Sequence, residues 1–313
     1  MSTIQRRWMR LVVNGKAAGD PGLREAVAHT RDQGHRVEVR ATWESGDAFH
    51  YAAAAADEGV EVVVAGGGDG TVNEVAAGLV EAGPESRTAM GVVPYGTAND
   101  FASGMGILKG EPKSALDLAA RGSATRIDVG RVNDRIFVNV ASGGFGAQVT
   151  ASTPPELKKA IGGAAYSLMG VVTAAKLNPY DCKLILPDGT EDKGRLLLMA
   201  VGNGRQCGGG YQVTPYAYPD DGLLDVVAIH DVDISKIGLV LSEILDMRAK
   251  SNRFVTYRRL PSFSIELNQP FQMNLDGEPY RDRLFEFSVL PRALPFVLGP
   301  NAPLQPKEDT QSD

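Results

Sequence analysis

The residues best suited to chemistry lie in a glycine-rich segment that follows an apolar run. Residues 65–74 read Ala-Gly-Gly-Gly-Asp-Gly-Thr-Val-Asn-Glu and come directly after Val-Glu-Val-Val-Val at 60–64. Glycines at the end of a buried strand let the backbone approach a ligand and leave N–H groups free to point at an anion. A helix over 72–82 would add the positive end of its dipole at the same place. The segment therefore predicts a phosphate-binding loop, in which Asp69 could meet a metal ion, a hydroxyl or a ribose.

Two better-known phosphate motifs do not fit this segment. The dinucleotide fingerprint requires G-x-G-x-x-G/A, but Thr71 stands at its last position after Gly66 and Gly68. The P-loop requires Gly-Lys followed by Ser or Thr, and no such tripeptide occurs in the chain. A plain glycine-rich turn is the alternative interpretation. The composition of the segment between a strand and a helix favours a phosphate loop of a different kind.

The elements around this segment have the pattern of a parallel sheet wrapped by helices, because short apolar strands alternate with helical stretches up to about Val129. The predicted strands cover 9–13, 36–41, 60–64 and 90–93, and the predicted helices cover 23–33, 47–58, 72–82 and 112–120. Ligands gather beyond the carboxyl ends of such strands. Asn14, Thr42, residues 66–71 and residues 96–100 are therefore expected to share one cleft, although each is also a common turn former.

Beyond about Arg131 the pattern changes to strands with turns, which is typical of an antiparallel β domain. The predicted strands cover 136–141, 182–187, 195–201, 223–230, 262–267, 271–275 and 284–290, with helices over 155–176 and 234–249 and a last segment, 294–298, that returns to the first domain. At 313 residues the chain exceeds the usual size of one core. We therefore predict an α/β domain at 1–130, a β-rich domain at 131–300 and a disordered tail at 301–313.

The composition indicates a globular protein and argues against a nucleic-acid-binding or membrane-spanning one. With 43% hydrophobic and 22% charged residues the chain is ordinary globular material. A net charge of -6 argues against nucleic acid as a partner. No run approaches the ~18 apolar residues of a membrane span, and residues 1–10 lack the apolar core of a signal peptide, so we expect a cytoplasmic protein. The two cysteines and four histidines show no metal or redox spacing.

Three motifs together form a recognisable set: Gly-Gly-Gly-Asp-Gly-Thr-Val-Asn-Glu at 66–74, Pro-Tyr-Gly-Thr-Ala-Asn-Asp-Phe at 94–101 and Leu-Asp-Gly-Glu-Pro at 275–279. With them the chain resembles the diacylglycerol kinase-like family, most closely the YegS-type bacterial lipid kinases. The first motif is shared with NAD kinases, whereas the second is more specific for the lipid kinases. The resemblance implies an N-terminal Rossmann-like parallel α/β nucleotide-binding domain and a C-terminal antiparallel β-sandwich domain.

The resemblance also implies an activity, the transfer of the γ-phosphoryl group of ATP to a free hydroxyl of a glycerolipid such as phosphatidylglycerol or diacylglycerol. The matching positions for contact with ATP are Thr42, Gly66, Gly67, Gly68, Asp69, Gly70, Thr71, Val72, Asn73, Glu74 and Thr97. Asn99 and Asp100 would hold the shape of the cleft, help with metal or cap a helix. An NAD kinase-like enzyme for a small molecule and a catalytically silent nucleotide-binding regulator are the alternatives.

For the proton of the lipid hydroxyl, the resemblance implies Glu278 as acceptor, with Asp276 supporting or sharing the role. An alcohol is a poor nucleophile until a base accepts its proton. The alternative is that Asp276 and Gly277 only form a type I′ hairpin turn, for which Asp-Gly is a usual sequence.

Mg²⁺ is expected on chemical grounds because it bridges phosphates and absorbs developing charge, with Ca²⁺ as a further candidate. The resemblance implies a separate metal position, with the Asp221 carboxylate and the main-chain carbonyls of Tyr218 and Leu223 as ligands; Asp220 or a solvated turn is the alternative.

A lipid substrate implies peripheral, transient contact with the inner face of the membrane. Basic residues could draw the enzyme to anionic lipid, either Arg253, Arg258 and Arg259 or Lys158 and Lys159.

Overall fold

The computed structural model describes residues 6–144 and 179–306. The helix predicted over 155–176, with Lys158 and Lys159, lies outside the described residues, as do residues 307–313 of the predicted tail.

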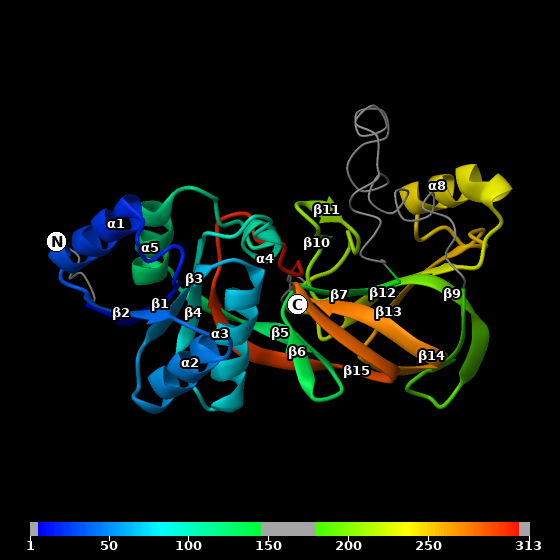
Figure 1. The fold of residues 1–313 in the computed structure, drawn as a ribbon, viewed down its shortest axis with the longest axis horizontal. Coiled ribbons are helices and arrows are strands. Elements are labelled where there is room, and N and C mark those ends of the chain that lie inside the picture. Colours follow the sequence, from blue (N-terminus) through cyan, green and yellow to red (C-terminus); the bar gives the residue numbers. More distant parts are fainter. Residues whose placement is uncertain (1–5, 145–178, 307–313) are drawn as a thin grey trace, which may run out of the picture.

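The first half of the chain contains a parallel sheet with helices on both faces, as predicted. Its strands lie in the order β2-β1-β3-β4, and α1 and α5 cover one face while α2 and α3 cover the other (Figure 1). The strands are β1 (Trp8–Asn14), β2 (Arg36–Thr42), β3 (Val62–Gly67) and β4 (Ala89–Pro94), and the helices are α1 (Pro21–Asp32), α2 (Asp47–Asp57), α3 (Asp69–Glu81) and α5 (Pro112–Arg121).

Burial explains why these residues form the centre of the sheet. Every residue of β3 and β4 is buried, which suits the continuous apolar sequence of a strand covered on both faces. The start of α1 is fixed by Asp20, whose side chain accepts a hydrogen bond from the Leu23 amide at 2.8 Å, and by Pro21 in the first turn.

Helix α3 begins at Asp69, three residues before the predicted start at Val72. Gly68 is the extended N-cap residue, and Asp69 places a negative charge in the first turn, where the helix dipole favours it. Asp69, Gly70 and Thr71 therefore belong to the helix and not to a loop before it.

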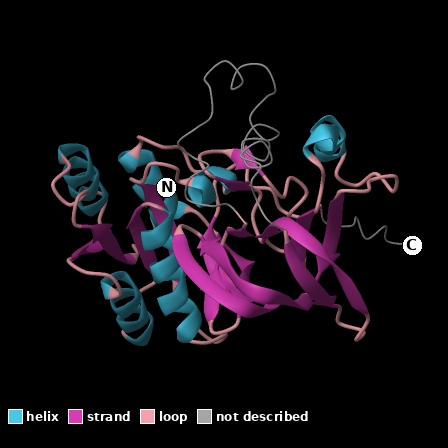
Figure 2. Cartoon of the chain, turned by 45° about the vertical axis from the view of Figure 1, so that its right-hand side comes forward, coloured by secondary structure: helices cyan, strands magenta, loops and turns pink. Residues whose placement is uncertain are grey.

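The second half is rich in antiparallel strands, again as predicted, and Figure 2 shows them gathered at one end of the molecule. The strands are β5 (Ala124–Val132), β6 (Arg135–Phe137), β7 (Val140–Gly143), β8 (Tyr180–Ile185), β9 (Glu191–Gly202), β10 (Gln206–Cys207), β11 (Tyr211–Gln212), β12 (Leu224–His230), β13 (Val255–Leu260), β14 (Ser262–Leu275) and β15 (Glu278–Val297). The remaining helices are α4 (Asp100–Gly104), the 3₁₀ turn η1 (Ile234–Lys236) and α8 (Ile237–Leu245).

Two pairs of predicted strands are each one continuous strand. β14 spans 262–267 and 271–275, and a shift of register between Glu266 and Phe271 takes up the interruption that the sequence suggested. β15 likewise runs through 284–290 and most of 294–298, ending at Val297, with a register shift against β5 between Leu290 and Leu294.

The end of β15 joins the two halves into one sheet. Phe296 pairs in parallel with Met90 of β4, and the Phe296 and Phe101 rings meet edge to face with centroids 5.2 Å apart. The structure thus connects the last strand to the α/β half, while the boundaries at 130 and 300 stay a prediction. Among the described helices, none is both long and apolar enough to cross a membrane.

The close contact between α2 and α3 generates a prediction. A β-carbon added at Gly78 would lie 2.3 Å from the Phe49 carbonyl oxygen and 3.0 Å from the Ala52 β-carbon. Gly78→Ala should therefore force the helices apart and lower the free energy of unfolding by ~1–3 kcal/mol, measured by urea denaturation. Gly104→Ala is the matched control, since a β-carbon there meets nothing within 4 Å. Equal stability of the two variants would contradict this account of the packing.

Candidate active site

A cleft of about 520 Å³ lies at the carboxyl ends of β1, β3 and β4. Because parallel strands end at the same sheet edge, the segments that follow these three strands meet there. The residues that line the cleft are Asn14, Lys16, Ala17, Asp20, Gly67, Gly68, Gly70, Thr71, Tyr95, Gly96 and Thr97.

Two glycine-containing segments touch in this cleft. A β-carbon added at Gly96 would lie 2.4 Å from the α-carbon of Gly68, so this contact has no space for a side chain at Gly96. Asn99 fixes the second segment: its side chain accepts a hydrogen bond from the Gly96 amide at 2.6 Å and donates one to the Gly96 carbonyl at 2.8 Å. Asn99 makes no side-chain bond to the amides of α4, although it is the N-cap residue.

The carboxylates of Asp69 and Asp100 accept hydrogen bonds from backbone amides of neighbouring segments. Asp69 Oδ1 accepts a hydrogen bond from the Phe101 amide at 3.2 Å, and burial raises the pKa of this carboxyl. Asp100 accepts from the amides of Gly209 and Gly210, between β10 and β11, at 2.6 to 3.1 Å. Both carboxylates therefore have backbone donors as partners, and these bonds fix the positions of the loops.

The remaining residues predicted to contact ATP do not line the cleft. Gly66 is buried within β3 against Leu11 and Val13, and Val72 is buried in the core. Glu74 accepts a hydrogen bond from the Gly46 amide at 3.1 Å, and Asn73 donates to Asp276. Thr42 lies at the end of β2 and pairs with Asn14. The role of these residues toward a nucleotide stays a prediction.

Lys16, Asp20 and Tyr95 line the cleft although they were not among the predicted nucleotide contacts. Lys16 had a sequence signal, since it follows directly on the end of the first strand. Tyr95 donates a hydrogen bond to Asp20 Oδ1 at 3.0 Å, and burial, with the Asp20 charge, raises the pKa of Tyr95. No local pattern could indicate that contact, because its partners are 75 residues apart.

The segment 275–279 is a two-residue hairpin turn between β14 and β15. Leu275 pairs with Glu278, and both central residues have positive φ, 49° at Asp276 and 106° at Gly277, as a type I′ turn requires. The turn interpretation is thus correct for the backbone. It does not exclude a chemical role, because the turn points Asp276 and Glu278 toward α3.

The Asp276 carboxylate is buried and accepts four hydrogen bonds. Three come from the amides of Val138, Asn139 and Val140 at 2.6, 3.1 and 2.9 Å, and one comes from Asn73 Nδ2 at 2.9 Å. Burial raises the pKa of Asp276 to about 6, although these four donors act in the opposite direction. The carboxylate therefore binds α3 and the start of β7 to the hairpin turn.

Glu278 is exposed and lies over the first turn of α3. A β-carbon added at Gly70 would be 3.3 Å from Glu278 Oε1, so the absence of a side chain at Gly70 makes room for this carboxylate. Gly70 lines the cleft, and Glu278 is therefore next to it. The turn that follows β14 brings the Glu278 carboxylate to the glycine segment from the far end of the sequence.

Of the predicted metal ligands, Asp221 lies near two further buried carboxylates, those of Asp128 and Asp225. Burial raises the pKa of each of these carboxyls. Asp221 binds Arg259 and also accepts from the Leu223 amide at 3.0 Å, while Asp225 Oδ2 accepts no hydrogen bond and forms an ion pair with Arg259 Nε at 3.7 Å. Buried oxygen atoms of this kind suit a hard cation. Within residues 6–144 and 179–306, however, no three His, Cys, Asp or Glu side chains are grouped as a metal site.

Comparison with known proteins identifies two matching family models. The "Diacylglycerol kinase catalytic domain" matches residues 9–132, and the "YegS C-terminal NAD kinase beta sandwich-like domain" matches residues 139–298. A protein of Chromohalobacter salexigens named "Probable lipid kinase YegS-like" is 45% identical over 91% of both chains. A protein of Yersinia pseudotuberculosis with the same name is 40% identical over 94% of this chain and 98% of its own.

A solved structure supports the fold. The crystal structure of a diacylglycerol kinase from Bacillus anthracis superposes with a TM-score of 0.69, covering 95% of this chain and 99% of the other. The identity is 22%, so this likeness concerns the fold alone.

The raised pKa of Asp276 generates a prediction about pH. The folded value of about 6 lies above the ordinary value of 3.8, so the neutral carboxyl contributes stability that is present below about pH 4 and is lost as the pH rises through 6. Asp276→Asn cannot titrate. The stability advantage of the wild type over Asp276→Asn should therefore shrink by up to ~3 kcal/mol between pH 4 and pH 7, measured by urea denaturation. An advantage that grows with pH would show that the four donors outweigh burial.

Proposed function

This chain belongs to the diacylglycerol kinase family as a YegS-type lipid kinase, and from that premise we propose that it transfers the γ-phosphoryl group of ATP to a free hydroxyl of a glycerolipid, phosphatidylglycerol or diacylglycerol. The observation that carries the proposal is the position of Glu278 Oε1, which lies 3.3 Å from where a β-carbon of Gly70 would be. A carboxylate beside a glycine segment and a helix N-terminus suits a reaction in which a hydroxyl attacks a phosphate.

The cleft is proposed to hold the ATP phosphates. Its volume of about 520 Å³ lies within the usual range for small-molecule sites. The amides of Gly67 to Gly70 and the N-terminal end of α3 would face the phosphate oxygens, and Lys16, which also lines the cleft, would add a positive charge. Thr97 lines the same cleft, while Thr42, Gly66, Val72 and Glu74 would support its walls.

In the proposed reaction Glu278 accepts the proton of the lipid hydroxyl while the hydroxyl oxygen bonds to the γ-phosphorus. The bond from the γ-phosphorus to the bridging oxygen breaks, and ADP leaves with that oxygen. Asp276 acts as a positioning residue, because four donors already engage its carboxylate. Mg²⁺ entering with ATP would neutralise charge on the phosphates.

We further propose that the carboxylate of Asp221 and the main-chain carbonyls of Tyr218 and Leu223 hold a second cation, Mg²⁺ or Ca²⁺. The support is the burial of Asp221 and of the neighbouring Asp225, whose Oδ2 accepts no hydrogen bond and has only Arg259 Nε, at 3.7 Å, as an ion-pair partner. The Asp221 carboxylate would then bind the cation in place of Arg259.

Label transfer tests the function itself. The protein is incubated with γ-labelled ATP, Mg²⁺ and mixed micelles of phosphatidylglycerol or diacylglycerol, with NAD in a parallel reaction. Label in a lipid supports the proposal and identifies the head group. Label only in NAD would assign a soluble substrate, and no transfer despite ATP binding would assign a silent regulator.

Glu278→Gln tests the proton acceptor. The amide keeps the size of the side chain but cannot take the proton, so kcat for lipid phosphorylation should fall by ~100-fold or more while the Kd for ATP stays near that of the wild type. Glu286→Gln is the matched control, since Glu286 is also exposed and on β15. Turnover by Glu278→Gln equal to that of the control would eliminate Glu278 as the base.

Lys16→Gln tests the polyphosphate site. Removal of a charge-assisted contact to the phosphates should raise the KM for ATP by roughly tenfold, measured in steady-state kinetics, with no change in the KM for lipid. Lys113→Gln, on the exposed start of α5, serves as the control. An effect on the lipid KM alone would place Lys16 on the acceptor side of the reaction.

A further inference from the structure

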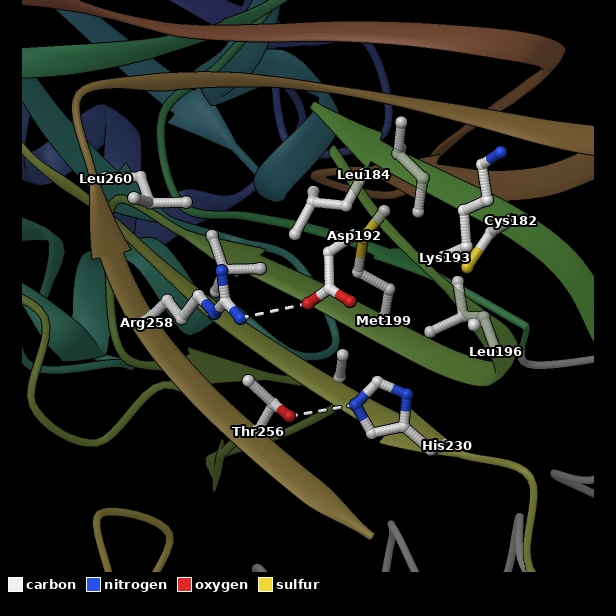
Figure 3. Close-up of a pocket in the computed structure, with 14 residues that line it drawn as sticks. Cys182, Leu184, Asp192, Lys193, Leu196, Met199, His230, Thr256, Arg258 and Leu260 are labelled. Atoms are coloured by element: carbon white, nitrogen blue, oxygen red, sulfur yellow. Dashed lines mark hydrogen bonds and ion pairs between the residues drawn. The ribbon is translucent and has the colours of Figure 1, made fainter. Parts of the chain in front are cut away.

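A second cavity, of about 270 Å³, lies in the β-rich half and shares no residue with the nucleotide cleft. Its walls come from β8, β9, β12, β13 and β14 (Figure 3), which lie at the opposite end of the sheet from β1 to β4 (Figure 1). The period-two alternation of β12 and β13 places Val226, Ala228 and His230 beside Arg258 and Thr256 on this face.

The interior of the cavity is apolar. Its wall is formed by Leu184, Leu196, Met199, Val226, Leu260 and Ile265. Protein interiors are usually packed without voids of this size, and an apolar cavity that stays dry can take an apolar guest.

Small residues create the space. Ala228 and Gly194 lie on the wall, and a β-carbon added at Gly194 would meet only His230 Nδ1 within 4 Å, at 3.9 Å. Larger side chains at these positions would point into the cavity. The space is therefore a property of two positions that can be changed by mutation.

A guanidinium lines the cavity. Arg258 pairs with Asp192 at 3.1 Å (Figure 3), and these side chains are 35% and 58% exposed, so solvent reaches the cavity at this pair. Lys193 also lines the cavity and stands opposite Lys183 in the β8–β9 ladder. His230 bonds to Thr256 at 2.8 Å, and burial lowers the pKa of its ring, which is therefore uncharged at neutral pH.

We propose that this cavity binds a free medium-chain fatty carboxylate, with its chain against the apolar wall and its head group on Arg258. A guanidinium binds a carboxylate through two parallel hydrogen bonds, and loss of the exposed Asp192 partner costs little. A volume of about 270 Å³ holds roughly nine water-sized groups at ~30 Å³ each, so a chain of about eight to ten carbons is of comparable size. The site is separate from the kinase centre and does not depend on the kinase assignment.

Titration calorimetry with decanoate, below its micelle concentration and without ATP, tests the proposal. The wild type and Gly194→Ala should bind one decanoate saturably. Gly194→Leu should bind at least ~10-fold more weakly, because its side chain occupies the cavity. Ala228→Leu fills the same space from the neighbouring strand and provides a second test if Gly194→Leu does not fold.

A second set of measurements tests whether Arg258 binds the carboxylate head group. Arg258→Gln should weaken decanoate binding by ~10-fold, and decyltrimethylammonium, which has the same chain and a cationic head, should bind the wild type at least ~10-fold more weakly than decanoate. Absence of saturable decanoate binding, or equal binding by the wild type and both cavity-filling variants, would overturn the proposal. So would competition of decanoate with the lipid substrate, since the cavity would then hold the substrate's own chain.

Discussion

The carboxylate of Asp276 is the interaction on which the arrangement of the candidate site depends. It lies in a turn between two long strands, yet its donors belong to the helix that follows the glycine segment and to the start of β7. A buried carboxylate without such donors would be costly, so the turn, the helix and β7 must be held in one geometry to satisfy it. That geometry puts Glu278 over Gly70. The chemistry that we propose for Glu278 is therefore built on a neighbour whose own oxygens are already occupied.

The same sheet carries two regions of opposite character. At the edge of the parallel strands, glycines and short polar side chains line the cleft in which we propose that the ATP phosphates bind. At the other end, small residues on two strands leave an apolar hollow with one guanidinium at its mouth. Both regions arise where side chains are absent or small, at Gly68, Gly70 and Gly96 in the cleft and at Gly194 and Ala228 in the cavity.

Local patterns in the sequence were sufficient for the parallel half of the fold and for its glycine segment, because buried strands and amphipathic helices have strong periodicities. They failed where tertiary contacts decide. Helix α3 starts at Asp69 since the dipole and the N-cap at Gly68 favour it, while the strand signals of β14 and β15 are interrupted by register shifts that pairing tolerates. Four strands, β5, β10, β11 and β13, and the short helix α4 were not predicted. In the cleft, the pairing of Tyr95 with Asp20 joins distant segments, so no spacing rule could reveal it.

The most direct test of the central claim is a double-mutant cycle on kcat for lipid phosphorylation, with Asn73→Ala, Asp276→Asn and the double variant. If the contact between Asn73 and Asp276 positions Glu278, each single variant should lower kcat with little change in the KM for ATP. The double variant should then be no worse than Asp276→Asn alone, with a coupling free energy of ~1–3 kcal/mol. Additive losses, or a normal kcat for Asn73→Ala, would contradict the claim that this contact connects the glycine segment to the catalytic turn.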